Sequence, residues 1–340
     1  MYRNLRPLLF RLDAESAHSL ILNLLRLAGV TPGLSNAIKV FYQAPDVPVE
    51  AFGLRFKNPV GLAAGYDKDG IGWRGLSLLG FGHIELGTVT PLPQSGNAPP
   101  RVFRLVQDEA LVNRMGFPGR GAEYLANAIS GNRPVDLVLG VNLGKNAATP
   151  FDSALDDYLG LLKRFADLAD YLVINVSSPN TVGLRRLQAR HELDKLLNGL
   201  VAARQDEEAR IAKKIPILVK LSPDLSNTEL EDALDVIIAN GIDGVVATNT
   251  TTSRKDVDTK LSSEVGGLSG RPLASVSTEV VRKINKYTKG NLSIIGVGGV
   301  MQGSDAQAKL EAGAKLVQIY TGLVYTGPGL VKSILEALSH

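Results

Sequence analysis

The sequence has no cysteine and only four histidines among its 340 residues. The absence of cysteine excludes disulfide bonds, thiolate metal sites and a thiol acting as nucleophile or base. The few scattered histidines argue against a zinc site, so no metal is expected. No apolar run reaches the roughly 20 residues that a membrane-spanning helix needs. The sequence therefore predicts a protein without transmembrane segments or metal ligands.

The sequence also has little excess of charge of either sign, because its formal net charge is only +3. The excess lies in residues 1–40, where five basic residues stand against two acidic ones: Arg3, Arg6, Arg11, Arg26 and Lys39 against Asp13 and Glu15. The remaining 300 residues are neutral by the same count. Nucleic-acid binding needs many cations on one face, so no nucleic-acid partner is expected.

Residues 1–30 combine leucines with arginines, but acidic residues interrupt the apolar run and no small-residue cleavage site follows, which argues against a signal peptide. Asp13 can begin a helix that Gly29 ends, and apolar positions share one side of it: Ala14, Ala17, His18, Ile21, Leu24, Leu25 and Ala28. Such a helix can lie on a membrane surface or pack on its own domain, and the residues leave both alternatives open.

Beyond residue 58, eight short apolar runs recur, each ending in polar residues or glycine: PVGLAAG, HIELGTVT, LVLGVNLG, YLVINVSS, PILVKLS, GVVATNT, SIIGVGG and LVQIYTG. Helix-period segments such as 226–241 separate most of them. This alternation indicates a parallel sheet covered on both faces, and eight units favour closure. We predict an α/β fold: a (β/α)8 (TIM) barrel over residues 41–340, with a small α-helical extension over residues 1–40. The long loops 91–121 and 251–271 are candidate lids or site walls.

Polar residues follow every predicted strand, where a parallel barrel gathers its reactive groups at one mouth. They are Lys68, Thr88, Asn142, Asn175 to Asn180, Lys220, Thr248 to Thr250, Gly298 with Gly299, and Tyr320 with Thr321. A single polar strand end means little. Eight in one ring predict a lined pocket.

Two glycine-rich segments, GVGG after the seventh strand and GGLSG ending at Gly270, suggest a phosphate site, although tight turns explain either alone. Lys68 and Lys220 would be costly at a dry barrel mouth without anionic partners.

Five asparagines fall at strand ends or in a lid: Asn113, Asn142, Asn175, Asn180 and Asn249. Each alone suits a turn. Together their paired donors and acceptors favour recognition of a polar planar ligand such as a pyrimidine-dione.

These motifs, with NPVGLAAGYDKDG, NRMGF, INVSSPNTVGLR, VKLSPD, TNTT and GGLSGRPL, resemble dihydroorotate dehydrogenase in order over nearly the whole chain. The amphipathic start resembles the membrane-associated, quinone-dependent class 2. The resemblance implies a flavoprotein oxidoreductase of pyrimidine biosynthesis that oxidises dihydroorotate to orotate with FMN and passes the electrons to a membrane quinone of the ubiquinone type. It also implies peripheral attachment to the cytoplasmic side of the inner membrane, and we expect a monomer.

The resemblance also implies roles for individual residues. To FMN it assigns Ala63, Ala64, Gly65, Lys68, Thr88, Asn142, Asn175, Lys220, Thr248, Gly270, Gly299, Tyr320 and Thr321. To dihydroorotate it assigns Lys68, Asn113, Arg114, Met115, Gly116, Phe117, Asn175, Asn180, Asn249 and Thr250. To the quinone it assigns His18, Arg104 and Tyr320, although His18 on its apolar stripe also suits a core histidine.

The residues alone do not choose between Ser177 and Ser178, but the resemblance makes Ser178 the base where soluble class 1 enzymes use cysteine. Ser178 would take a proton from C5 of dihydroorotate while hydride moves from C6 to N5 of FMN. A free serine is a poor base, so Ser178 would pass the proton on through water and a hydroxyl such as Thr181. Val182 replaces an expected proline, and Thr321 replaces a common serine. Two rivals remain: an FMN barrel oxidase with a histidine base, and a flavoprotein without turnover.

Overall fold

The computed structural model describes residues 2–255, 257 and 263–339. Eight parallel strands close into a barrel in the order β10, β12, β13, β3, β4, β7, β8, β9. Their bounds are β3 (Val60–Leu62), β4 (His83–Val89), β7 (Val138–Leu143), β8 (Tyr171–Asn175), β9 (Ile217–Leu221), β10 (Gly244–Ala247), β12 (Ser293–Val297) and β13 (Leu316–Ile319). The predicted eight strands and the closed barrel are confirmed. Nearly all their residues are buried, as expected of strands covered by helices.

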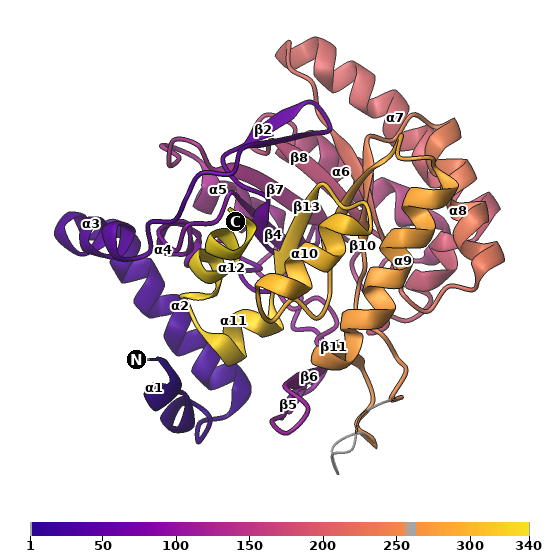
Figure 1. Cartoon of the computed structure of the whole chain (residues 1–340). Helices are drawn as coiled ribbons and strands as arrows, with labels where there is room; N and C mark the ends of the chain where they lie inside the picture. The colour runs from indigo at the N-terminus through magenta and orange to yellow at the C-terminus, as the bar shows by residue number, and fades with distance from the viewer. Residues whose placement is uncertain (1, 256, 258–262, 340) are drawn as a thin grey trace.

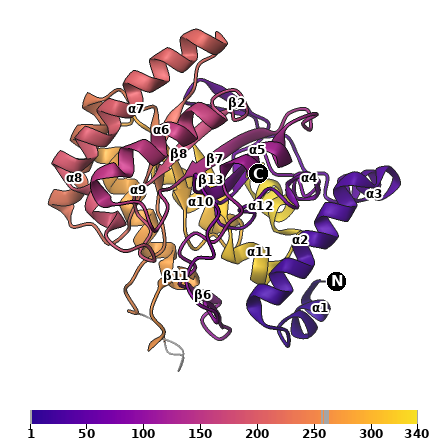
Figure 2. The same ribbon diagram turned by 180° about the vertical axis from the view of Figure 1, so that it is seen from behind.

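Helices alternate with these strands and surround them (Figures 1 and 2). Their bounds are α4 (Trp73–Ser77), α5 (Ala122–Ile129), α6 (Ala154–Phe165), α7 (Arg190–Ile211), α8 (Asn227–Ala239), α9 (Ala274–Tyr287), α10 (Gly303–Glu311), α11 (Thr321–Thr326) and α12 (Leu330–Leu338). The helix expected over 226–241 is α8. Ser226 caps it by accepting from the Glu229 amide, while Glu229 accepts from the Ser226 amide.

Three helices precede the barrel: α1 (Tyr2–Leu9), α2 (Ala14–Val30) and α3 (Pro32–Phe41). They lie at one side of the molecule, beside α11 and α12 (Figure 1). Asp13 caps α2, as predicted, by accepting from the amides of Glu15 and Ser16. The prediction that Gly29 ends this helix is wrong, because α2 continues to Val30. A Cβ at position 29 would lie 2.6 Å from the Gly75 amide nitrogen, so glycine is needed there for close packing on α4.

An antiparallel hairpin, β1 (Val49–Ala51) with β2 (Leu54–Phe56), covers the ends where the barrel strands begin. Its aromatic side chains enter the barrel, where the Phe56 ring lies 5.4 Å from His83 and the Phe52 ring 5.4 Å from Tyr171. The hairpin closes the end of the barrel opposite the predicted site.

The two long loops pair with each other rather than covering the mouth separately. Residues 91–121 contain β5 (Val102–Leu105) and β6 (Ala110–Asn113), and residues 251–271 contain β11 (Gly267–Gly270). These strands form one antiparallel sheet in the order β11, β6, β5. The sheet forms a wall of the site because each strand contributes a residue to its lining. None of the helices within the described residues is both long and apolar enough to cross a bilayer.

The hairpin gives a test of how much the closed end contributes to stability. Phe56 is fully buried, so Phe56→Ala should lower the free energy of unfolding by about 3–5 kcal/mol. Phe41→Ala removes the same atoms from a side chain that is 66% exposed and should cost less than about 1 kcal/mol. Urea unfolding of both variants measures the difference, and equal losses would contradict the assignment of the hairpin to the core.

Candidate functional site

A cavity lies at the carboxyl ends of the barrel strands, which we call the rim cavity. Seventeen residues that the sequence singled out line it: Ala63, Ala64, Gly65, Lys68, Thr88, Asn113, Met115, Gly116, Phe117, Asn175, Ser178, Asn180, Lys220, Thr248, Asn249, Thr250 and Tyr320. They come from six of the eight barrel strand ends and from the β5–β6 segment. The closed barrel therefore brings together residues up to 257 positions apart, from Ala63 to Tyr320.

Five of the residues predicted for FMN or dihydroorotate do not line the rim cavity. Asn142 lies behind it and contacts Thr88 and Asn175. Arg114 pairs with Glu264 and donates to the Pro100 carbonyl. Gly270 and Gly299 belong to the two glycine-rich segments, and Thr321 begins α11. A Cβ at position 270 would lie 2.9 Å from Thr321 Cγ2.

Asn175, at the end of β8, is the centre of the site's amide network. Its Nδ2 donates to Thr88 Oγ1 at 2.9 Å and to Asn142 Oδ1 at 3.0 Å. Its Oδ1 accepts from Asn249 Nδ2 at 3.3 Å. Asn180 Nδ2 donates to Asn113 Oδ1 at 3.0 Å, so the loop after β8 is also joined to the β5–β6 segment. These contacts orient four of the five asparagines at the cavity, where their remaining groups can meet a planar polar ligand.

Ser177 and Ser178, which the residues alone did not separate, differ in their surroundings. Ser177 is fully buried, and its Oγ accepts from Asn249 Nδ2 at 3.0 Å. Ser178 Oγ faces the rim cavity and accepts only from the Asn180 amide, at 3.3 Å. The Ser178 hydroxyl proton therefore has no acceptor among the described residues, and this oxygen is the one available to a ligand.

Lys68 and Lys220 place two cations on the rim cavity. Lys68 Nζ donates to the Gly65 carbonyl at 2.9 Å, and burial lowers its pKa to about 8, partly offset by Asp69 and Glu15. Lys220 is buried, and its Nζ has no hydrogen-bond or ion-pair partner among the described residues. Burial lowers the pKa of Lys220, while Glu85 opposes that shift. A buried cation without a partner, such as Lys220, favours an anionic ligand.

The turn after β12 offers donors for such an anion. The amides of Gly299 and Val300 donate to no acceptor within the described residues. Thr321, which begins α11, likewise has a free amide, and its hydroxyl lies 2.8 Å from Ser269 Oγ. Free amides on glycine-rich turns after the last two strands of a barrel suit a phosphate group.

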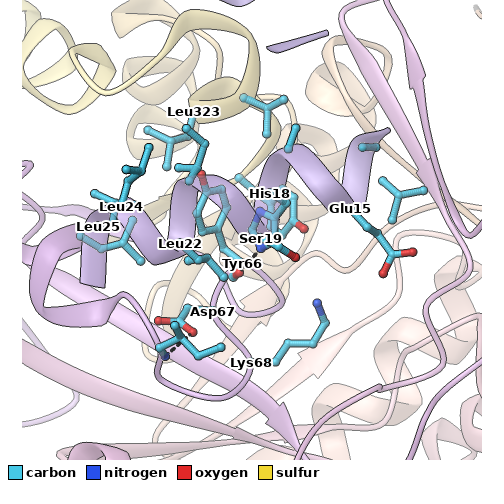
Figure 3. A pocket seen from close by; sticks show the side chains of 18 of the residues that line it. Glu15, His18, Ser19, Leu22, Leu24, Leu25, Tyr66, Asp67, Lys68 and Leu323 are labelled. Carbon is cyan, nitrogen blue, oxygen red and sulfur yellow. Dashed lines mark hydrogen bonds between the residues drawn. The ribbon is translucent and has the colours of Figure 1, made fainter. Parts of the chain in front are cut away.

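A second cavity of about 820 Å³, which we call the helix cavity, lies between the N-terminal helices and the barrel. Leucines of α2 line much of it, and His18, Arg104 and Tyr320 all contribute to its wall. Figure 3 shows His18 beside Tyr66, with Lys68 and Glu15 nearby. The two cavities share five lining residues: Lys68, Val102, Leu111, Met115 and Tyr320. A ligand in either cavity therefore lies against the same wall.

His18 and Arg104 have distinct contacts in this cavity. His18 Nε2 lies 2.7 Å from the Tyr66 carbonyl oxygen and so must carry the hydrogen. Burial, reinforced by the Lys68 charge, lowers the pKa of His18 to about 4, so the ring is neutral at pH 7 with Nδ1 as an acceptor. Arg104 donates to the Leu12 carbonyl at 2.8 Å and lies over the Phe10 ring, which ties β5 to the turn between α1 and α2.

Sequence reasoning missed residues that support or line the site. Glu85 accepts from Asn142 Nδ2 and from Gln318 Nε2, both at 2.7 Å, inside the barrel. A carboxylate and an amide within the runs HIELGTVT and LVQIYTG were signals that could have identified both. Val102 and Leu111, in the β5–β6 wall, carried no such signal. Within the described part of the chain, no cluster of three or more His, Asp or Glu residues could hold a metal ion.

Comparison with known proteins gives one consistent result. The family model for dihydroorotate dehydrogenase matches residues 47–340. The chain is 48% identical to "Dihydroorotate dehydrogenase (quinone)" of Paraburkholderia phymatum, over 100% of this chain and 98% of that protein. It is 46% identical to the protein of the same name from Teredinibacter turnerae, over 100% and 99%. The crystal structure of Eimeria tenella DHODH in complex with ferulenol superposes with a TM-score of 0.86, at 37% identity, over 96% of this chain and 90% of that one.

The neutral His18 ring predicts a pH effect on stability. Between pH 6.5 and 4 the unfolded chain binds a proton at His18 that the folded chain does not bind, so stability falls as the pH is lowered through this window. His18→Gln should reduce the slope of the free energy of unfolding against pH by up to the contribution of about one proton. His191→Gln, which alters a side chain that is 88% exposed, should leave it unchanged. Urea unfolding across this range measures the slopes, and parallel curves for wild type and His18→Gln would refute a buried neutral ring.

Proposed function

Because the chain belongs to the dihydroorotate dehydrogenase family, we propose that it oxidises (S)-dihydroorotate to orotate in pyrimidine synthesis and passes the electrons to a membrane quinone. The observation that carries this proposal is the pair of cavities that share the wall of Lys68 and Tyr320. One is polar, cationic and rich in amides, and the other is apolar. A polar substrate and an apolar electron acceptor each fit one of them.

FMN is the cofactor we propose for the rim cavity and the turns beside it. The free amides of Gly299 and Thr321, with Gly270 at the end of β11, suit its phosphate. Lys220 and the Asn175 network suit the polar edge of its ring, where Lys220 would gain a hydrogen-bond acceptor and would stabilise negative charge on the reduced ring. The backbone of Ala63, Ala64 and Gly65, with Thr88 and Thr248, would complete the binding site. When bound, FMN supplies a hydride acceptor.

Dihydroorotate is proposed to lie against the amides of the same cavity. Its ring presents N–H and C=O groups that the side chains of Asn113, Asn175, Asn180 and Asn249 can pair with, together with Thr250. Its carboxylate would pair with Lys68 and with amides of the Asn113–Phe117 segment. The Arg114 guanidinium is engaged by Glu264, so only its backbone is proposed to contribute.

Ser178 is the group we propose to take the proton from C5. Serine is a weak base, so a relay must carry the proton on. Thr181 Oγ1, three residues along the same loop, is buried and has no hydrogen-bond partner among the described residues, which suits a relay position. No histidine lines the rim cavity in the described part of the chain, which argues against the rival oxidase with a histidine base.

The helix cavity is the proposed quinone site. Tyr320 and Arg104 would offer donors to the quinone oxygens near the wall shared with the rim cavity, and His18 Nδ1 would accept from a hydroxyl of the reduced quinone. Leucines of α2 would contact the apolar parts of the quinone.

The N-terminal helices are also the proposed membrane contact. Among the described residues, ten of the nineteen exposed large hydrophobic side chains lie within the first 41 positions, for example Leu8, Leu27 and Val40. The basic residues of the same segment favour anionic lipid headgroups. We propose a monomer bound peripherally to the cytoplasmic side of the inner membrane.

Ser178→Ala should slow reduction of the bound flavin by dihydroorotate by roughly 10²-fold or more, since this is the usual contribution of general-base catalysis. Ser177→Ala removes the neighbouring hydroxyl, which does not line the rim cavity, and should slow it less than about tenfold. Stopped-flow absorbance of the flavin measures both rates. Reduction of the Ser178 variant at the wild-type rate would show that another group takes the proton.

Ala17→Trp should fill the helix cavity, because Ala17 is buried on α2 and lines it. We expect quinone reduction to fall at least about tenfold, whereas flavin reduction by dihydroorotate stays within about twofold, as expected of a step that uses only the rim cavity. Ser16→Trp, one residue earlier and exposed, is the matched control. Undiminished quinone reduction in Ala17→Trp would place the acceptor elsewhere.

A further inference from the structure

Lys309 is a buried cation outside both cavities. It lies in the last turn of α10 and is 1% exposed. Its aliphatic stem packs on β12, where a Cβ at Gly296 would lie 3.2 Å from Lys309 Cδ. None of the ion pairs among the described residues includes it. An unpaired ammonium in this position is costly, so a second role for it is worth seeking.

The ammonium contacts two hydroxyls at the start of α9. Lys309 Nζ donates to Ser277 Oγ at 2.5 Å and to Thr278 Oγ1 at 3.1 Å. Because lysine can only donate, each hydroxyl keeps its own hydrogen for another acceptor. Thr278 Oγ1 donates to the Ala274 carbonyl at 2.8 Å, and Ser277 Oγ can donate to the Gly298 carbonyl at 2.9 Å.

The Gly298 carbonyl belongs to the same peptide group as the Gly299 amide. That amide is one of the free donors of the turn after β12. A hydrogen-bond chain therefore runs from the Lys309 ammonium, through the Ser277 hydroxyl, to the Gly298–Gly299 peptide. The N–H of this peptide points away from Lys309. Hydrogen bonds in such a chain polarise one another, so a cation at one end makes the last N–H a stronger donor.

Packing fixes the position of this peptide as well. A Cβ at Gly299 would lie 2.3 Å from Ala274 Cα, so the turn rests directly on the first residue of α9. A Cβ at Gly298 would lie 3.0 Å from Ser277 Oγ. The turn after β12 and the start of α9 thus form one unit, held by Lys309 from behind.

We propose that Lys309 is a positioning residue for the phosphate group of the bound flavin, acting through Ser277 and the Gly298–Gly299 peptide. This inference rests on the FMN site proposed above. A phosphate dianion on the open side of the turn would add negative charge near Lys309, which makes no ion pair among the described residues. Burial lowers the pKa of Lys309 to about 7, against the opposing effect of Asp305, and a bound dianion would raise that pKa again.

The test compares FMN with riboflavin, which lacks the phosphate, on the full-length protein stripped of flavin. Quenching of flavin fluorescence gives the dissociation constant of each, and their ratio isolates the phosphate contribution. We expect wild type to favour FMN. Lys309→Met should reduce that preference by roughly 10-fold, the scale of groups one contact removed from a bound charge, and leave the riboflavin constant within about threefold.

Two further variants distinguish an effect carried by these hydrogen bonds from an effect of a general loss of folding. Ser277→Ala keeps the cation but breaks the chain, so it should also lower the preference, and adding Lys309→Met to it should lower the preference by less than in wild type. Lys145→Met is the matched control, because Lys145 is 3% exposed and donates only to the carbonyls of Asn146 and Thr149. It should leave the preference unchanged.

The outcomes distinguish the two levels of the proposal. A full preference for FMN in Lys309→Met or in Ser277→Ala, or equal loss of both flavins in Lys309→Met, would overturn the role of Lys309. A wild-type protein that binds neither flavin would instead overturn the proposed cofactor itself.

Discussion

Closure of the eight-stranded parallel barrel is the constraint on which the rest of the structure depends. Pairing of β10 with β9 on one side and with β12 on the other completes the ring, so every strand ends at the same mouth. Asn175 and Lys220 become neighbours because they face each other in the register of β8 and β9. The hairpin of β1 and β2 fills the opposite end, which leaves one end of the barrel for chemistry.

The second organising feature is the wall between two cavities of opposite character. Lys68 and Tyr320 belong to both cavities. Lys68 places a cation on the polar side, and the Tyr320 ring packs on Tyr66 with the ring centres 5.4 Å apart. The N-terminal helices create the apolar side only because they are tied to the barrel. Arg101 pairs with Glu15 at 3.0 Å, and Arg104 holds the turn before α2. Substrate and electron acceptor can thus be kept apart while sharing a boundary.

The sequence predicted the barrel and the gathering of its strand ends because both follow from periodicity and from the geometry of parallel strands. It did not predict that the long loops pair as β5, β6 and β11, since such pairing joins residues about 155 positions apart. Nor did it predict α3 or the packing role of Gly29, which depends on how closely α2 approaches α4. The choice of Ser178 over Ser177 came from resemblance, and only three-dimensional surroundings separate the two hydroxyls. Lys309 carried no signal, because its importance lies in contacts between helices.

A flavin in the rim cavity must be reducible by dihydroorotate alone. Anaerobic titration of the purified protein with dihydroorotate, without any pyridine nucleotide, measures this reaction. We expect stoichiometric bleaching of the flavin absorbance, followed by recovery when a ubiquinone analogue is added. A colourless protein that takes up no flavin, or a bound flavin that dihydroorotate leaves oxidised, would contradict this expectation.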